Sequence, residues 1–308
     1  MHGRVSDFAW MQVWGFLFVN KSKPALVNKK KAQLMHTIGA TMIIDTHAHY
    51  DDHRFDEDRE ALISSLGERG VELAVNASAS LEECRETLKL CEQYPNIYGM
   101  IGVHPDEAAS ITEESFNWMR EVSLENAVYN GGKIVAIGEI GLDYYKPDDE
   151  SEIICPKDIQ KEWFIRQLCL ARELKMPVNI HSRDACEDTL NIMKSEHAEE
   201  IGGIIHCYSY SVETAREYLK MGFSFGIGGV VTFKNAKRLH EVTEFLPIEN
   251  IVLETDAPYL CPAPHRGERN DSTFISFVAA KIAEIKGLTT EEVIDITNKN
   301  ARRVYAIK

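Results

Sequence analysis

Eight short segments rich in β-branched and other apolar residues recur along residues 42–308, and segments with helical periodicity separate them. They are MIIDTH (42–47), VELAVNAS (71–78), IYGMIGVH (97–104), IVAIGEIG (134–141), PVNIHS (177–182), GGIIHCYS (202–209), FSFGIGG (223–229) and IVLETDAP (251–258). Most of them lack polar alternation in their first half, which is typical of strands buried on both faces. Eight strands that alternate with helices, without an internal linker, predict an α/β fold made of a single (β/α)8 TIM barrel.

The segments between the strands carry the signals of amphipathic helices. We expect helices at 58–70, 80–94, 158–175 and 211–222. The second of these opens with Ser80 and has Glu83 three residues later, a pattern that predicts a capping box. The final stretch, 289–307, is predicted to be a C-terminal helix that closes the barrel.

Residues 1–41 differ in composition from the rest of the chain. They contain six lysines and arginines against a single acid, Asp7, whereas the whole chain of 308 residues has a formal net charge of −14. The apolar run at 8–19 is too short to span a bilayer, and no small-residue cleavage site of a secretory signal follows it. We therefore expect an N-terminal extension at 1–41, dispensable or poorly ordered and outside the barrel, and one domain at 42–308.

Charge and cysteine content exclude some classes of protein. The net charge argues against a large nonspecific duplex-binding surface, which would be basic. It leaves a nucleic-acid substrate open, because bound divalent cations can supply local positive charge. The seven cysteines are scattered and odd in number, which favours reduced thiols in a cytoplasmic protein over a disulfide framework. We expect no membrane partner, and a monomer or weak oligomer.

Histidines and acids stand where several predicted strands end. His47 and His49 are two residues apart, so their side chains project from the same face of the first strand and can begin a metal site. The other strand-end residues of this kind are Glu139, His181, His206 and Asp256. Because a barrel of this type carries its chemistry at the carboxyl ends of its strands, these six residues predict the centre of a two-metal hydrolase. Such nitrogen and carboxylate ligands suit Zn, Mn, Fe or Ni, and weakly Mg.

Each of these residues also has a structural interpretation. A strand-end histidine such as His181 or His206 often serves as a hydrogen-bonded structural residue. Glu139 could pair with Arg183, and Asp256 could cap the segment that follows it. The occurrence of six such residues at one end of the predicted barrel favours a metal site over a separate structural role for each of them.

Six motifs in fixed order resemble the TatD family of metal-dependent deoxyribonucleases. They are IDTHAH, GEIGLDYY, IHSRDA, IHCYS, GIGGVVTF and ETDAPYLCPAPHRGERN, and the resemblance covers residues 42–308. It implies a barrel akin to the amidohydrolases, two divalent metal ions per chain (Mg, Mn, Zn, Fe or Ni) and hydrolysis of DNA phosphodiester bonds. One departure is visible: the family pattern leads us to expect an acid and a proline after RGERN, whereas this chain has Asp271 and Ser272.

The resemblance also implies roles for individual residues. His47, His49 and Glu139 would hold one metal together with Asp256, while Glu139, as the bridging ligand, would hold the other with His181 and His206. Glu139 and Asp256 are the catalytic carboxylates, and Asp256 is expected to accept the proton of the attacking water. For the DNA substrate, single-stranded or bound by its end, we expect contacts from Arg183, Arg266, Tyr144 and His104. The two arginines suit a phosphate clamp and the tyrosine suits base stacking, although pairing with nearby acids and core packing stay open.

Two other functions compete with a nuclease. An amidohydrolase-like enzyme that cleaves an amide, lactone or aminoacyl ester would share the barrel and the His-x-His motif. Many such enzymes bridge their metals with a carboxylated lysine, whereas strand four ends here in Glu139 and Lys133 lies at its wrong end. A noncatalytic, metal-stabilised binding scaffold is a remoter alternative, and it predicts the loss of a proton-transfer carboxylate that this chain keeps as Asp256.

Overall fold

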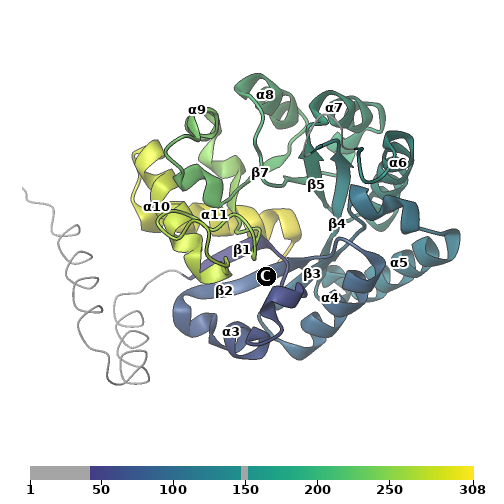
Figure 1. Cartoon of the computed structure of the whole chain (residues 1–308), viewed down its shortest axis with the longest axis horizontal. Helices are drawn as coiled ribbons and strands as arrows, with labels where there is room; N and C mark the ends of the chain where they lie inside the picture. The colour runs from purple at the N-terminus through teal and green to yellow at the C-terminus, as the bar shows by residue number, and fades with distance from the viewer. Residues whose placement is uncertain (1–41, 147–151) are drawn as a thin grey trace, which may run out of the picture.

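Eight parallel strands follow one another in chain order around a barrel, and helices lie outside them (Figure 1). The computed structural model describes residues 42–146 and 152–308, so the expected extension at 1–41 lies outside the described residues. The strands are β1 (Ile43–Ala48), β2 (Val71–Ala77), β3 (Ile97–Ile101), β4 (Ile134–Asp143), β5 (Val178–Arg183), β6 (Gly203–Ile205), β7 (Ser224–Ile227) and β8 (Ile251–Leu253). The predicted (β/α)8 barrel is confirmed.

The barrel closes where β8 meets β1. Ala48 and Ala257 form a parallel bridge, and the backbone N–H of His49 donates to the carbonyl of Ala257 at 2.7 Å. The backbone N–H of Asp256 donates to the carbonyl of His47 at 2.9 Å. The first and last strands therefore hold two predicted ligand segments side by side.

Helices follow the strands in the described part of the chain. They are α3 (Arg59–Ser65), α4 (Leu81–Gln93), α5 (Glu113–Glu125), α6 (Lys157–Leu174), α7 (Cys186–Ser195), α8 (Val212–Lys220), α9 (Lys237–Phe245), α10 (Ile275–Lys286) and α11 (Thr290–Tyr305). Within the described residues, none of these helices is long and apolar enough to cross a membrane. The seven cysteines are all free.

The start of α4 differs from the predicted capping box in one contact. Ser80 is the N-cap, and its hydroxyl accepts from the backbone N–H of Glu83 at 3.2 Å, as expected. The carboxylate of Glu83 accepts instead from the backbone N–H of Ala79 at 2.7 Å, one residue before the cap. This contact fixes the loop after β2, which borders the cavity described below.

The C-terminal helix α11 seals the barrel at the amino ends of the strands. Its residues Ala301 and Tyr305 are buried in one apolar cluster with barrel residues that include Ile44, Val75 and Met100. Asn298 of α11 also accepts from the backbone N–H of Ile44 at 3.0 Å. Apolar packing thus fills the lower part of the barrel, which leaves the carboxyl ends of the strands for polar side chains.

Candidate metal centre

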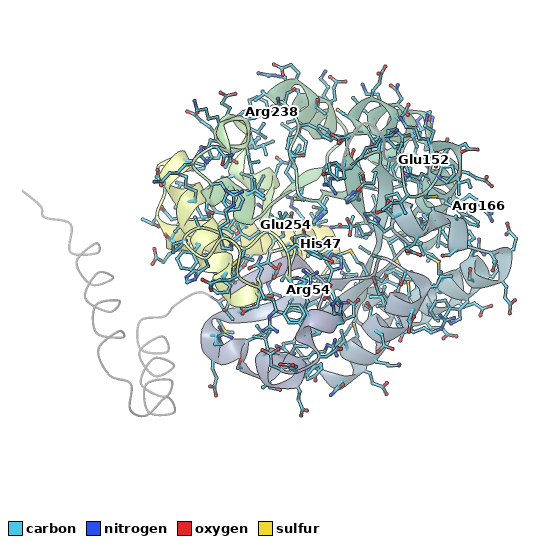
Figure 2. The ribbon with its side chains drawn as sticks, in the orientation of Figure 1. His47, Arg54, Glu152, Arg166, Arg238 and Glu254 are labelled. Atoms are coloured by element: carbon cyan, nitrogen blue, oxygen red, sulfur yellow. The ribbon has the colours of Figure 1, made fainter. Side chains whose placement is uncertain are left out.

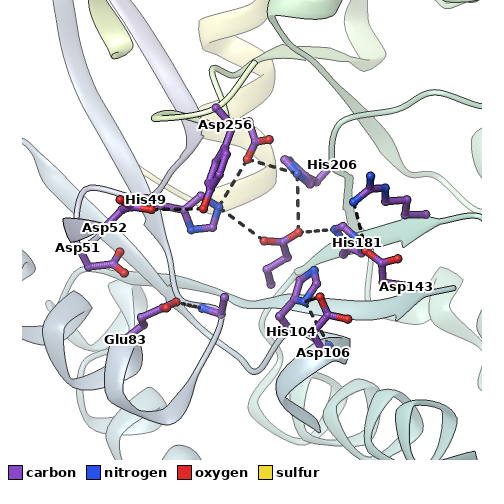
Figure 3. A pocket seen from close by; sticks show the side chains of 14 residues that line it. His49, Asp51, Asp52, Glu83, His104, Asp106, Asp143, His181, His206 and Asp256 are labelled. Atoms are coloured by element: carbon purple, nitrogen blue, oxygen red, sulfur yellow. Dashed lines mark hydrogen bonds and ion pairs between the residues drawn. The ribbon is translucent and has the colours of Figure 1, made fainter. Parts of the chain in front are cut away.

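The six predicted ligands come together at the carboxyl end of the barrel. Five of them line a cavity of about 350 Å³, while His47 is fully buried beside it (Figure 3). Figure 2 shows His47 in the middle of the molecule, inside the ring of helices. These side chains come from β1, β4 and β5 and from the residues that follow β1, β6 and β8. A parallel barrel brings them together because all its strands end on one rim.

Glu139 lies between two groups of histidines and turns one oxygen toward each. Its Oε2 is 3.4 Å from Nε2 of His47 and 3.7 Å from Nε2 of His49. Its Oε1 is 2.6 Å from Nδ1 of His181 and 3.7 Å from Nε2 of His206. The two oxygens of this carboxylate therefore face different groups of histidines.

The contacts of His47 and His49 fit a cation between their rings. Nδ1 of His49 donates to the carbonyl of Ala77 at 2.9 Å, and Nδ1 of His47 donates to Oδ1 of Asn179 at 3.0 Å. In the neutral rings, both Nε2 atoms therefore carry lone pairs, and they face each other at 3.1 Å. A proton or a metal ion between them removes this repulsion, so the donor set fits a divalent cation.

Asp256 completes this group from the loop after β8. Its Oδ1 lies 3.5 Å from Nε2 of His49 and 3.8 Å from Nε2 of both His47 and His206. Burial alone would raise the pKa of this carboxyl, but the three histidines outweigh burial and lower it. The backbone turns here through the left-handed region, with φ 57°, a conformation that is uncommon for a non-glycine residue and that clusters at functional sites.

His181 contacts a carboxylate at each ring nitrogen. Besides Glu139 at Nδ1, it has Oδ2 of Asp143 at 3.1 Å from Nε2. Burial lowers the pKa of this imidazole, but the hydrogen bonds to Asp143 and Glu139 outweigh burial and raise it to about 10. Asp143 was not predicted, because the fourth strand was expected to end at 141 and β4 continues to Asp143.

His206 is oriented by a second acid that the sequence analysis missed. Its Nδ1 lies 3.3 Å from Oε2 of Glu254, and Oε1 of Glu254 accepts from the backbone N–H of Cys207 at 2.7 Å. The Nε2 of His206 is thereby turned toward Glu139 and Asp256. Glu254 stands two residues before Asp256, and the period of two in extended chain was the signal that could have revealed it.

Without a cation, the centre holds protons. Burial lowers the pKa of His49 and of His206, but the surrounding carboxylates outweigh burial and raise these pKa values to about 10 and about 9. Because a metal ion needs neutral imidazole ligands, its binding has to displace these protons. We therefore expect metal affinity to increase as the pH rises from neutrality toward 9.

The residues expected to bind substrate divide into two groups. His104 and Arg183 line the cavity, and the ring of His104 meets that of His181 edge-on with a centroid distance of 4.3 Å. Tyr144 and Arg266 do not line it. The phenol of Tyr144 donates to Asp188 at 2.9 Å, and the guanidinium of Arg266 lies 4.6 Å from the centre of the Phe233 ring.

Several acids on the cavity wall were also not predicted. They are Asp51, Asp52, Glu83, Asp106 and Asp143. Together with Glu139 and Asp256 they give the cavity a strongly acidic lining, against which Arg183 is the one arginine or lysine that lines it. The acidic lining therefore favours the binding of cations, and it disfavours an anionic substrate unless cations are bound first.

Asn179 links the centre to the C-terminal helix. Its Nδ2 donates to the phenol oxygen of Tyr305 at 3.1 Å, and that phenol donates to the carbonyl of Thr46 at 3.2 Å. Because the phenol proton is committed to Thr46, the amide must turn its Oδ1 toward His47. This arrangement keeps the proton of His47 on Nδ1 and its Nε2 lone pair toward the cavity. Asn179 stands two residues before His181, a spacing from which its inward direction could have been predicted.

Replacing Asn179 with alanine is expected to lower the metal affinity of the centre about 10- to 100-fold, the usual effect of removing the outer partner of a metal-binding histidine. The physical reason is that His47 loses the acceptor that fixes its tautomer. Affinity is measured by competition with a chromogenic chelator, and Asn179→Asp, which keeps an acceptor, is the control. Unchanged affinity in a folded Asn179→Ala variant would contradict this role.

Comparisons with known proteins agree with the fold and with a metal-dependent hydrolase family. The chain matches the family model described as TatD related DNase over residues 44–306. It is 44% identical over 266 residues to a Bacillus subtilis (strain 168) protein named as an uncharacterized metal-dependent hydrolase, YabD, covering 86% of this chain and 100% of that one. A Rahnella sp. (strain Y9602) protein named 3'-5' ssDNA/RNA exonuclease TatD is 31% identical, over 82% of this chain and 94% of that one.

The solved structure of a related protein has a similar fold. The crystal structure of YJJV, a TatD homolog from Escherichia coli K12, matches with a TM-score of 0.77 and 27% identity, covering 86% of this chain and 98% of that one. Because the family match and these relatives span nearly all of the barrel, the chain belongs to the TatD-related DNase family of metal-dependent hydrolases.

Proposed function

We propose that the protein is a deoxyribonuclease that hydrolyses phosphodiester bonds with two divalent metal ions, as an exonuclease that prefers single strands or ends. The position of Glu139 carries this proposal, because one oxygen faces His47 and His49 while the other faces His181 and His206. His47, His49, Glu139 and Asp256 would hold one ion, and Glu139, His181 and His206 the other. When bound, such ions lower the pKa of water and neutralise charge on phosphoryl oxygens.

The protein's own residues would supply the proton transfer and the orientation. Asp256 is the proposed proton acceptor, since its Oδ1 lies beside both groups of histidines. Arg183 reaches the cavity with a half-exposed guanidinium, whose fork of N–H donors matches a phosphate. His104 borders the same space, where its partly buried ring can position the substrate.

The electrostatics of the chain favour a flexible strand over a duplex. A net charge of −14 offers little of the basic surface that binds a duplex by releasing its counterions. The proposed ligands lie in a cavity at the end of the barrel, which an unpaired nucleotide can enter. An internal duplex bond would have to be distorted to reach them. The name of the Rahnella relative, which is an exonuclease of single-stranded DNA and RNA, supports this substrate class.

The amide-cleaving alternative has no specific support in the structure. Lys133, the candidate for a carboxylated bridging lysine, donates to the carbonyls of Cys91 at 2.8 Å and Tyr94 at 2.6 Å. Lys133 directly precedes β4, whose carboxyl end carries the cavity, so it lies at the opposite end of the barrel as expected. The proposed bridging ligand is Glu139 instead.

An assay with end-labelled oligonucleotides tests the proposed function. We expect metal-dependent shortening of single-stranded DNA, slower attack on blunt duplex and no reaction with chelator. The same assay with an RNA oligonucleotide measures the preference between the two nucleic acids. Faster cleavage of closed-circular duplex than of a single-stranded oligonucleotide would overturn the proposed preference, and the absence of cleavage with every divalent metal would overturn the nuclease function.

A further inference from the structure

Two tyrosines with large exposed faces flank the cavity. Tyr145 is 40% exposed and Tyr259 is 47% exposed, although aromatic side chains of this size usually bury more of their surface. In the described part of the chain, Tyr129 is the third tyrosine with comparable exposure, at 51%, and it lies before β4, away from the cavity. Exposed aromatic rings beside a proposed nuclease centre need an explanation.

Each of the two rings is stacked against an arginine. The guanidinium carbon of Arg54 lies 4.0 Å from the centre of the Tyr259 ring, and that of Arg183 lies 3.5 Å from the centre of the Tyr145 ring. Tyr259 and Arg183 line the cavity directly. We call these two units the Tyr259–Arg54 pair and the Tyr145–Arg183 pair.

A carboxylate at the cavity wall holds each pair. Arg54 donates to both oxygens of Asp52, at 3.0 and 2.8 Å, and the phenol of Tyr259 donates to the same carboxylate at 3.2 Å. Arg183 has Oδ2 of Asp143 at 3.9 Å. Arg54 thus uses two N–H groups on Asp52 out of the five that a guanidinium carries, which leaves donors for an anion.

Asp143 also anchors the second pair through the backbone. Its Oδ1 accepts from the N–H of Tyr145 at 2.8 Å, and its Oδ2 lies 3.1 Å from Nε2 of His181. The position of the Tyr145–Arg183 pair is therefore tied to a proposed metal ligand. The Tyr259 ring is similarly close to the centre, because it meets the ring of His49 edge-on with a centroid distance of 6.2 Å.

The two pairs lie on opposite sides of the centre. The Tyr259–Arg54 pair follows β8 and β1, which are adjacent where the barrel closes, while the Tyr145–Arg183 pair stands at the ends of β4 and β5. In a closed barrel with strand order β1 to β8, these two positions are diametrically opposed. Figure 3 shows the same separation, with Asp52 and Asp143 on either side of the histidines.

We propose that the two pairs are nucleotide subsites, one on each side of the phosphodiester bond that is cleaved. Each tyrosine would stack on a base and each arginine would contact a flanking phosphate, so that one strand crosses the cavity. This inference rests on the proposed nuclease function and makes it more specific, since it assigns the substrate a path across the cavity and a minimum length of two nucleotides. Stacking suits the acidic chain, because it holds a strand without a basic groove and tolerates any sequence.

The test is the binding of a fluorescein-labelled oligonucleotide to the metal-loaded protein, followed by anisotropy in an Asp256→Asn background so that the probe is not shortened during the titration. Tyr259→Ala and Tyr145→Ala are each expected to weaken the Kd by roughly 5- to 150-fold, the range seen when a base-stacking ring is removed. Tyr259→Phe and Tyr145→Phe keep the ring and should stay near the parent value. Tyr129→Ala, which removes an exposed tyrosine away from the cavity, is the matched control.

The arginines give a separate readout. Removing one phosphate contact with Arg183→Gln or Arg54→Gln should lower the slope of log Kd against log salt by about 0.7 for a single strand. Metal content per chain, measured after dialysis against the activating metal, should be unchanged by both tyrosine-to-alanine substitutions, because neither ring is a proposed metal ligand. Affinity should also rise with oligonucleotide length until both pairs are occupied.

The outcomes separate the two proposals. If the parent protein hydrolyses no oligonucleotide with any divalent metal, the nuclease function fails, while the Kd values still report on the subsites. If the parent is active but both Tyr→Ala variants bind the oligonucleotide as tightly as Tyr129→Ala does, the subsites are wrong. An equal loss of bound metal in these variants would also overturn them, because it would show damage to the centre.

Discussion

Replacing Asp256 with asparagine is expected to lower kcat on a single-stranded oligonucleotide by about 10²–10⁴-fold, the usual contribution of a general acid–base group. Asparagine has nearly the shape of aspartate and still offers a neutral oxygen, but it cannot take up the proton of the attacking water. The lowered pKa of Asp256 keeps the parent residue ionised at neutral pH and ready to accept that proton. The fold and much of the metal content should therefore survive the substitution.

Steady-state kinetics and elemental analysis, run in parallel, check this result. KM should change far less than kcat, because Asp256 is proposed to act on the reacting water and not on the bases of the substrate. His104→Ala, at a residue that borders the cavity without belonging to either proposed ligand group, is the comparison and should cost much less. If Asp256→Asn keeps a rate within a few-fold of the parent, the residue is a replaceable ligand and the proton acceptor lies elsewhere.

Removal of divalent cations is the second change with a very large expected effect. It should reduce hydrolysis to the uncatalysed background. The cavity is lined mainly by acids and the substrate is itself an anion, so neither an activated water nor enough positive charge is available without cations. Activity should return when about two equivalents of the activating metal are added per chain, as a two-metal centre requires.

Metal content per chain, measured after dialysis against the activating metal, checks this stoichiometry. His206→Ala should lower the occupancy of one site selectively, since it removes one of the ligands proposed for that site while His47 and His49 are untouched. Fully active protein that contains one metal ion or fewer per chain would exclude the two-metal mechanism. An active chelated protein would exclude a metal-dependent hydrolysis altogether.

The barrel and its ligand ring could be predicted from short-range patterns. Eight apolar segments separated by helical segments leave few alternatives to a parallel barrel, and the direction of parallel strands puts His47, His181 and Asp256 on one rim. The His47–His49 contact follows from the period of two in a strand. These features depend on residues close together in the chain, so the amino-acid order alone determines them.

The partners of the ligands were decided by tertiary structure. Asn179 contacts His47 across the barrel interior, and that contact depends on how β5 and β1 face each other. Asp143 reaches His181 because β4 pairs with β5 as far as Asp143 and Arg183, two residues beyond the expected strand end. The register between two strands depends on the packing of the whole barrel, so it cannot be predicted from the sequence of either segment alone.

The substrate-binding residues show the same division. Tyr144 is adjacent to Asp143 in sequence, but successive residues of an extended chain point to opposite sides, and its ring packs away from the cavity beneath Lys157. Arg266 lies in the long loop after β8, whose path places it against Phe233. The sequence by itself determined which chemistry gathers at the carboxyl end of the barrel, because strand direction is a local property. Which side chains surround that chemistry was decided only by the tertiary structure, because it depends on strand register and loop path, which distant residues set together.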